Sequence, residues 1–128
     1  TRYAEQIWAA CEASPALHVP EVPANVQHAH YKCYAYVRPE QLAAGWNRDR
    51  IVAAINALGV PCYQGSCSEV YMEKAFDGTG WRPAAPLPTA HALGTTSVMF
   101  LVHPTLTQAE VDTTCTAIAQ VMQQATAA

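Results

Sequence analysis

The segment SVMFLV, residues 97–102, is the feature that most restricts how this chain can fold. An apolar run of strand length is typical of a strand covered on both faces, so we expect it in the middle of a sheet. A helix is predicted after it, because Thr107 and Glu110 have the spacing of a capping box. The buried stripe of that helix is predicted to consist of Val111, Cys115, Ile118 and Met122. The chain is therefore expected to pack a sheet against helices.

A length of 128 residues suits one domain over residues 1–128. Residues 1–14 are predicted to form a helix, and residues 15–27 an extended connector because they contain several prolines. Residues 28–125 are predicted to form a compact α/β unit. The fold class that follows is α/β of the two-layer α+β kind, in which a small sheet of about three strands packs against helices.

Three regular elements are expected early in the compact unit. The segment HYKCYAYV, residues 30–37, predicts a strand because its small and large residues alternate. One face would consist of Tyr31, Cys33, Ala35 and Val37. Asn47 is expected to cap the helix that follows, and Gly59 to end it in a left-handed conformation. The segment VPCY then predicts a short strand.

The stretch VPCYQGSCSEVYMEKAFDGTGWRP, residues 60–83, resembles a loop between regular elements. Ser66 and Glu69 have capping-box spacing, which predicts a short helix through about Ala75. The later segment LPTAHAL predicts about two further helical turns that stop at Gly94. Loops of this length in compact domains are often lids or binding elements, so we expect this one to contribute to a binding site.

Charge and composition narrow the range of partners. The formal net charge is −3 and the seven basic residues are scattered, so no basic stripe predicts nucleic-acid binding. No apolar run approaches the roughly 18 residues of a membrane span, and the first 14 residues lack the pattern of a signal peptide. Five cysteines form an odd set that is typical of a reducing compartment. We expect a cytoplasmic domain with no nucleic-acid or membrane partner.

A zinc site is one alternative that the sequence raises. His28, His30 and Cys33 lie close together in the sequence, and four residues separate Cys62 from Cys67, which is compatible with paired zinc ligands. However, a regular strand would direct His30 and Cys33 to opposite faces. Core packing and surface exposure therefore explain these residues more simply, and we predict no metal site.

Nucleophilic chemistry is a second alternative. Cys67 or a neighbouring serine in QGSCSE could act as a nucleophile if the fold brought His91 or His103 near enough to serve as a base. Helix capping by the serines and packing of the thiol explain the motif more simply. Lys32 and Lys74 are expected to be solvated amines rather than Schiff-base lysines. We predict no catalytic residue in this chain.

Four segments together carry a resemblance to a known family: HYKCYAYVRPEQL, RDRIVAAINALGVPCY, LPTAHAL and SVMFLVHPTLTQAEVDTTCTAIAQVM. In order and spacing they resemble the C-terminal small domain of the pyridoxal-phosphate (PLP) dependent sugar aminotransferases of the DegT/DnrJ/EryC1/StrS family. The last segment is similar to the family's apolar strand, His-Pro turn and closing helix. The resemblance extends over residues 1–125.

The resemblance implies a fragment of a fold-type I aminotransferase whose large N-terminal domain, absent here, holds the Schiff-base lysine and most contacts to PLP. The parent is expected to be a homodimer that acts on a nucleotide-linked or similar sugar, and the fragment alone to bind no cofactor firmly and to be inactive. The first residue, Thr1, fits a chain cut from a longer one. The implied substrate contacts are Tyr63, Ser66, Ser68 and Tyr71.

Two further hypotheses belong to different functional classes. The chain could be a free-standing α/β small-molecule-binding or regulatory module, or a zinc-binding module. An upstream chain with a cofactor lysine would favour the fragment, a native start near Thr1 the free-standing module, and a stoichiometric metal ion the zinc module. The fragment hypothesis also predicts that the chain exposes apolar surface that once met the large domain. The candidates for that surface are Trp8, Trp46 and Trp81.

Overall fold

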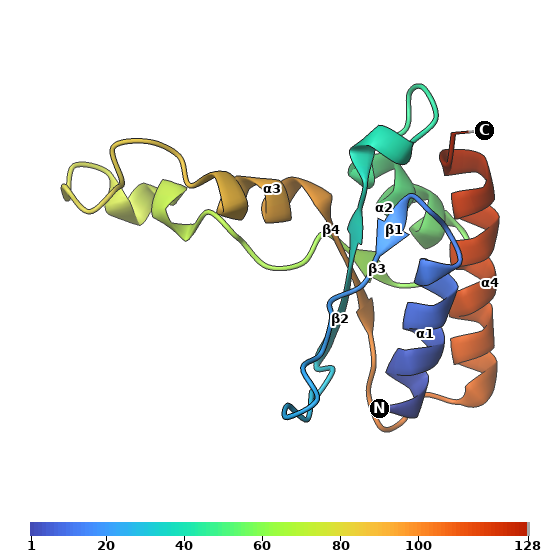
Figure 1. The fold of residues 1–128 in the computed structure, drawn as a ribbon. Helices are drawn as coiled ribbons and strands as arrows, with labels where there is room; N and C mark the ends of the chain where they lie inside the picture. Colours follow the sequence, from blue (N-terminus) through green and yellow to red (C-terminus); the bar gives the residue numbers. More distant parts are fainter. Residues whose placement is uncertain (128) are drawn as a thin grey trace.

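A four-stranded antiparallel sheet in the order β1-β2-β4-β3 forms one layer of the computed structural model, which describes residues 1–127 (Figure 1). The strands are β1 (Leu17–His18), β2 (Lys32–Val37), β3 (Cys62–Tyr63) and β4 (Ser97–Leu101). The helices are α1 (Arg2–Glu12), α2 (Arg48–Ala57), α3 (Pro88–Thr96) and α4 (Gln108–Ala125), with 3-10 turns at Pro39–Gln41, Val70–Met72 and Lys74–Phe76. Helices α1, α2 and α4 lie on one side of the sheet, which confirms the predicted two-layer α+β class.

Strand β4 is central, as its apolar sequence predicts. It pairs with β2 from Lys32 opposite Leu101 to Tyr36 opposite Ser97, and with β3 on its other edge. Its side chains from Ser97 to Phe100 are buried on both faces of the sheet. Burial on both faces explains why the segment shows no polar alternation.

The core lies between the sheet and the three helices. Its largest fully buried side chains include Phe100 of β4, Ile7 of α1, Ile51 and Ile55 of α2, and Ile118 of α4. The expected helix ends are present: the Asn47 side chain accepts a bond from the Arg50 amide, and Thr107 and Glu110 form a reciprocal capping box. Gly59 has φ +81°, which ends α2 in the left-handed region as predicted.

Strand β1 lies inside the predicted extended connector, so the sheet has one strand more than the expected three. Leu17 pairs with Val37, and its side chain is only 2% exposed, because it packs into the core. Beyond this short strand the edge of β2 is covered by Trp8, whose Nε1 donates a hydrogen bond of 2.9 Å to the Tyr34 carbonyl oxygen. This contact satisfies a backbone group that would otherwise lie on an open sheet edge.

Strand β2 begins two residues later than predicted, and its first expected residue turns inward. His30 has φ +51° and is buried, with its ring edge-on to that of Trp8 at a centroid distance of 4.7 Å. Tyr31 is 81% exposed and lies outside the strand, so the predicted face keeps Cys33, Ala35 and Val37 but loses Tyr31. The positive φ breaks the alternation on which the prediction depended.

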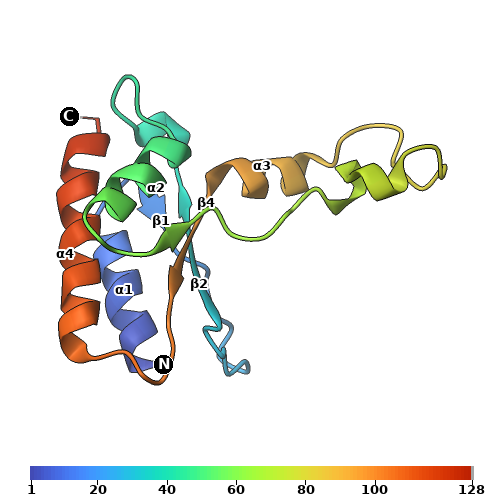
Figure 2. The same ribbon diagram turned by 180° about the vertical axis from the view of Figure 1, so that it is seen from behind.

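Residues 64–96 form an arm that projects from the sheet on the side opposite the helices (Figure 2). None of these residues is buried. The predicted helix from Ser66 to about Ala75 is wrong, because the segment forms two separate 3-10 turns without a side-chain cap. Without a core to pack against, a short helix has too little stabilisation to form from capping alone.

Helix α3 also differs from the prediction, because it runs through Gly94 to Thr96 instead of stopping at the glycine. A β-carbon at Gly94 would lie 2.2 Å from the Ser68 hydroxyl oxygen. The glycine therefore permits a close contact between the outgoing and returning segments of the arm rather than ending the helix.

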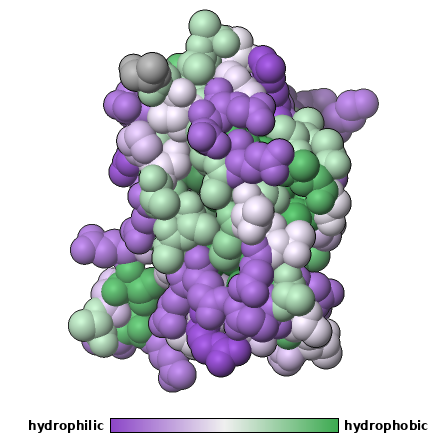
Figure 3. Space-filling model, turned by 90° about the vertical axis from the view of Figure 1, so that its right-hand side faces the viewer, coloured by the Kyte–Doolittle hydropathy of each residue, from purple (hydrophilic) through white to green (hydrophobic). Residues whose placement is uncertain are grey.

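The helix layer presents a mixed outer surface. Figure 3 looks onto this side of the molecule, where hydrophilic residues interrupt the hydrophobic ones. Within residues 1–127 no helix has the length and apolar character needed to cross a membrane.

Candidate functional site

The sheet face opposite the helices is polar and aromatic. Lys32, Tyr34 and Tyr36 point to this face because they alternate with the buried residues of β2. The Tyr34 and Tyr36 rings are stacked with centroids 6.3 Å apart, and the His18 ring lies 5.3 Å from that of Tyr36. Tyr63 is opposite Met99 in the register, so it belongs to the same face, and it is 47% exposed. We call these residues, Lys32, Tyr34, Tyr36, Tyr63 and His18, the open face.

Where the arm leaves the sheet, Ser66 contacts two residues of the open face. The Lys32 Nζ donates to Ser66 Oγ at 2.6 Å, and the Ser66 amide donates to the Tyr34 hydroxyl at 3.0 Å. The Tyr34 hydroxyl in turn donates to Ser66 Oγ at 3.4 Å. Burial would raise the pKa of Tyr34, but the bonds with Ser66 and the nearby ammonium lower that pKa overall.

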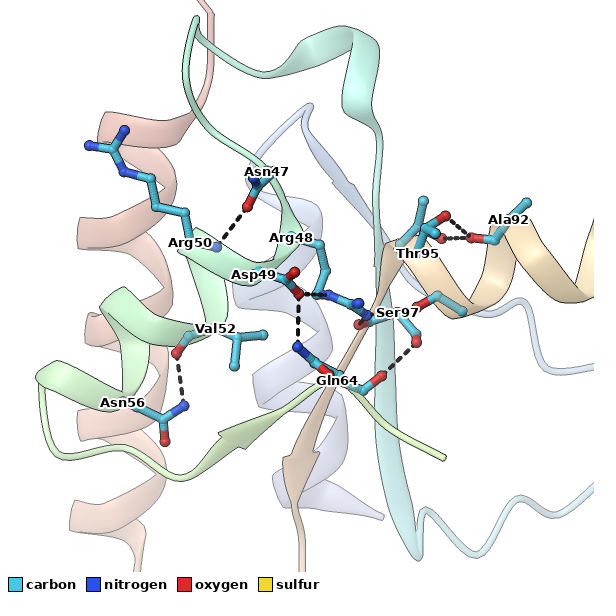
Figure 4. Close-up of polar contacts among 12 residues, drawn as sticks. Asn47, Arg48, Asp49, Arg50, Val52, Asn56, Gln64, Ala92, Thr95 and Ser97 are labelled. Atoms are coloured by element: carbon cyan, nitrogen blue, oxygen red, sulfur yellow. Dashed lines mark hydrogen bonds and ion pairs between the residues drawn. The ribbon is translucent and has the colours of Figure 1, made fainter. Parts of the chain in front are cut away.

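The two ends of the arm are held together against the first turn of α2 (Figure 4). The Ser97 hydroxyl donates to the Gln64 carbonyl oxygen at 2.7 Å, and the Gln64 side chain donates to Asp49 at 2.8 Å. Arg48 donates to the carbonyl oxygens of Gly94 and Ser97, each at 2.9 Å, and to Asp49 at 2.7 Å. Charged and neutral groups of α2 therefore fix where the arm starts and where it returns.

Farther along the arm, a network of three side chains joins the 3-10 turns to α3. The Tyr71 hydroxyl donates to one Glu69 oxygen at 2.8 Å and accepts the Leu87 amide at 2.9 Å. The other Glu69 oxygen lies 3.0 Å from Nδ1 of His91. The hydrogen bonds from Tyr71 and His91 lower the pKa of the Glu69 carboxyl. This network orders an arm that has no hydrophobic core.

Arg82 adds a second internal support. Its guanidinium donates to the carbonyl oxygens of Tyr71, Met72 and Glu73 at 2.8 to 3.1 Å and pairs with Asp77. A planar group with five donors can satisfy several carbonyls at once, which a lysine at this position could not do.

The four predicted substrate residues have separate partners. Ser66 contacts the open face, Ser68 lies against Gly94, Tyr71 belongs to the Glu69 network, and Tyr63 stands on the sheet. Their role toward a substrate stays a prediction. Sequence reasoning missed Tyr34 as a partner of these residues, and it considered Lys32, Glu69 and His91 only in other roles. The alternation of β2 could have identified Lys32 and Tyr34, because it places them on the face without helices.

The described residues do not fit a metal or PLP site. Among residues 1–127 no group of three or more His, Cys, Asp and Glu side chains is placed to hold a metal ion. A PLP site needs a lysine for the Schiff base, a carboxylate for the pyridine nitrogen and hydrogen-bond donors for the phosphate. Lys74 is exposed to solvent on the arm, and the Lys32 ammonium bonds to the Ser66 hydroxyl in a solvent-exposed setting, so neither amine has the desolvated surroundings that favour a Schiff-base lysine.

Exposed apolar side chains are concentrated on the arm. Of the three predicted tryptophans, Trp81 is 77% exposed, whereas Trp8 and Trp46 are half-buried against the core. The expectation of exposed tryptophan is therefore met by Trp81 and is wrong for the other two. The arm's other large exposed apolar residues are Val70, Met72, Leu87 and Leu93.

Solved structures of aminotransferases share this fold. An aminotransferase from Psychrobacter cryohalolentis matches 95% of the chain with 51% sequence identity and a TM-score of 0.90. A DegT DnrJ EryC1 StrS aminotransferase from Brucella abortus matches 93% of it with 22% identity and a TM-score of 0.73. The aminotransferase TlmJ from Streptoalloteichus hindustanus matches 95% with 15% identity and a TM-score of 0.78. The chain is a segment of the DegT/DnrJ/EryC1/StrS aminotransferase family.

The chain spans about a third of the length of these aminotransferases, 33%, 29% and 30% respectively. Its α+β fold matches the C-terminal domain of such enzymes, which confirms the family resemblance inferred from the four segments. No family model matches the chain. No curated protein matches it either.

Proposed function

We propose that this chain is the substrate-side C-terminal domain of a PLP-dependent aminotransferase that acts on a nucleotide-linked or similarly carbonyl-bearing sugar. The observation that carries the proposal is the 51% identity and TM-score of 0.90 to an aminotransferase over 95% of the chain. The parent enzyme would be a cytoplasmic homodimer of sugar biosynthesis. The N-terminal large domain would bind PLP, because the residues described here do not fit that cofactor.

The arm supports the substrate-side role. It presents the hydroxyls of Ser66 and Ser68, and a hydroxyl can both donate to and accept from the hydroxyls of a sugar. The Tyr71 hydroxyl gives its proton to Glu69, so it could contact a sugar as an acceptor. The arm is unburied yet ordered by Arg48, Glu69 and its other internal bonds. A preorganised element loses little conformational entropy when it binds, so it suits a substrate contact.

Two experiments test the proposal. The first mixes the 128-residue chain with PLP, reduces with borohydride and maps modified lysines; we expect no stoichiometric label on Lys32 or Lys74. The second assays transamination of keto-sugars by the complete protein of which residues 1–128 are a segment. We expect Tyr71→Phe and Ser68→Ala to raise KM roughly two- to tenfold, the effect of one hydrogen bond.

Tyr3→Phe is the matched control, because Tyr3 is a half-buried tyrosine on α1, away from the arm. It should leave KM unchanged. A stoichiometric PLP label on either lysine would overturn the assignment of the cofactor to another domain. Absence of amine transfer to every carbonyl sugar by the complete protein would overturn the proposed reaction.

A further inference from the structure

Lys32 differs from the arginines of this chain in what it contacts. All five arginines donate to carbonyl, carboxylate or amide oxygens of the protein: Arg2, Arg38, Arg48, Arg50 and Arg82. The Lys32 ammonium instead donates to the Ser66 hydroxyl, and no carboxylate among residues 1–127 forms an ion pair with it. The open face therefore holds a positive charge that is not neutralised by a neighbour among residues 1–127.

Several acidic residues contact the segment where the arm leaves the sheet, but each of them already has other partners. Asp49 accepts from Arg48 and Gln64, and Glu69 accepts from Tyr71 and contacts His91. Glu73 accepts from the thiol of Cys67, the residue next to Ser66. Each of these carboxylates has other partners, and none of them forms an ion pair with Lys32 in the part of the chain that the structure describes. The charge on Lys32 is available to an anion that comes from outside the described residues.

The hydrogen bonds around Ser66 leave donors free for such an anion. Ser66 Oγ accepts from Lys32 Nζ at 2.6 Å and from the Tyr34 hydroxyl at 3.4 Å, so the proton of the serine hydroxyl is not used in either bond. An ammonium has three N–H donors, and one is directed at Ser66. Two N–H groups and one O–H group therefore remain at the same point of the open face.

We propose that Lys32 and Ser66 bind a phosphoryl group of a small-molecule ligand at the root of the arm. The inference rests on the proposed function, and it assigns the phosphoryl of the sugar substrate to these two residues. One compact cation with an adjacent hydroxyl forms a non-planar set of donors, which suits the tetrahedral oxygens of a phosphoryl group. A planar carboxylate is matched better by the fork of an arginine. Tyr34 is a positioning residue, because it holds Ser66 through the backbone amide.

The test is an NMR titration of the ¹⁵N-labelled 128-residue chain with methyl phosphate. We expect the amide resonances of Ser66 and Gly65 to shift and to reach saturation. Lys32→Gln should abolish the saturable shift, and Ser66→Ala should weaken binding two- to tenfold. Lys74→Gln is the matched control, because Lys74 is an exposed lysine on the same arm, and it should change nothing. Unshifted resonances of α4 in each variant would show that the body is intact.

Two outcomes would overturn the proposal. One is the absence of a saturable shift at Ser66 in the unsubstituted chain, and the other is an equal response to acetate, which would show no preference for a phosphoryl group. This binding test contains no PLP, amino donor or sugar. If the chain binds methyl phosphate but the complete protein has no transaminase activity, the anion site stands and only the proposed reaction is overturned.

Discussion

Gly65 lies directly against the ring of Tyr34: a β-carbon added to the glycine would be 2.5 Å from Cε1 of the tyrosine. Gly65 also has φ +94°, a conformation that disfavours any side chain. The arm therefore leaves the sheet by passing over the Tyr34 ring at a distance that only glycine permits.

Gly65→Ala should release the arm from the sheet. The left-handed backbone alone costs about 1–2 kcal/mol with alanine, and the contact with Tyr34 adds to that cost. The amide of Ser66 donates to the Tyr34 hydroxyl, and we expect its hydrogen-exchange rate to rise at least tenfold. Gly78→Ala is the control, since Gly78 has φ +69° but open space around it. Equal loss of Ser66 protection in both variants would show that the Tyr34 contact is unimportant.

Arg48→Met should loosen the arm without unfolding the body. Arg48 joins α2 to the carbonyl oxygens of Gly94 and Ser97, and methionine retains the packing of the side chain but donates no hydrogen bonds. We expect faster hydrogen exchange throughout α3, and unchanged exchange in α4. The free energy of opening of the arm should fall by about 1.5–3 kcal/mol, the contribution of a hydrogen bond to a charged group.

Arg50→Met serves as the comparison for Arg48. Arg50 lies on the same helix, but it donates to Gly45 and stacks on the Trp46 ring at 4.2 Å instead of contacting the arm. Its substitution should leave the exchange of α3 unchanged. If both variants loosened α3 to the same extent, the effect would belong to α2 as a whole and not to the Arg48 bonds.

The body of the domain could be predicted from sequence because its signals are local and agree with one another. The apolar run of β4, the capping box at Thr107 and the left-handed Gly59 each specify their element without help from distant residues. The arm could not be predicted in the same way. Capping-box spacing at Ser66 predicted a helix, but Ser66 instead bonds to Lys32 and Tyr34, which are more than 30 positions away.

The surroundings of the candidate site residues could be predicted only in part, for the same reason, and the role of these residues toward a substrate stays a prediction. The residues Tyr63, Ser66, Ser68 and Tyr71 were chosen from one contiguous stretch, and the structure does place them on the arm and at its root. Their partners come from β2 and α3, so spacing within the stretch could not reveal them. His30 illustrates a different limit, because a single positive φ reversed the side on which its ring lies.

Thiol reactivity should separate Cys67 from the buried cysteines. Cys67 is exposed on the arm, whereas Cys11, Cys33 and Cys62 are buried in the core. Burial raises the pKa of Cys33 and of Cys62 to about 12. Because the thiolate is the reactive form, we expect maleimide to modify Cys67 at least a hundredfold faster than these two at pH 8. Peptide mapping by mass spectrometry measures the rates, and comparable modification of Cys33 in the native chain would contradict the packing described here.

His30 should make the folded chain less stable in mild acid. Burial lowers the pKa of His30, the neighbouring His28 lowers it further, and Glu5 acts in the opposite direction. A folded-state pKa below the unfolded value of about 6.5 means that the unfolded chain binds more protons in this range. The contribution of His30 to stability is therefore present above about pH 6.5 and is lost as the pH falls through the folded-state pKa.

His30→Asn should remove this part of the pH dependence, because asparagine tolerates the positive φ of the site but does not titrate. The measurement is the free energy of unfolding from urea denaturation at pH 7.5 and pH 5.5. The difference between the two values should be smaller in His30→Asn than in the unsubstituted chain. His103→Asn, at an exposed loop histidine, should keep the original difference. An unchanged difference in His30→Asn would mean that other groups govern the stability of this chain in acid.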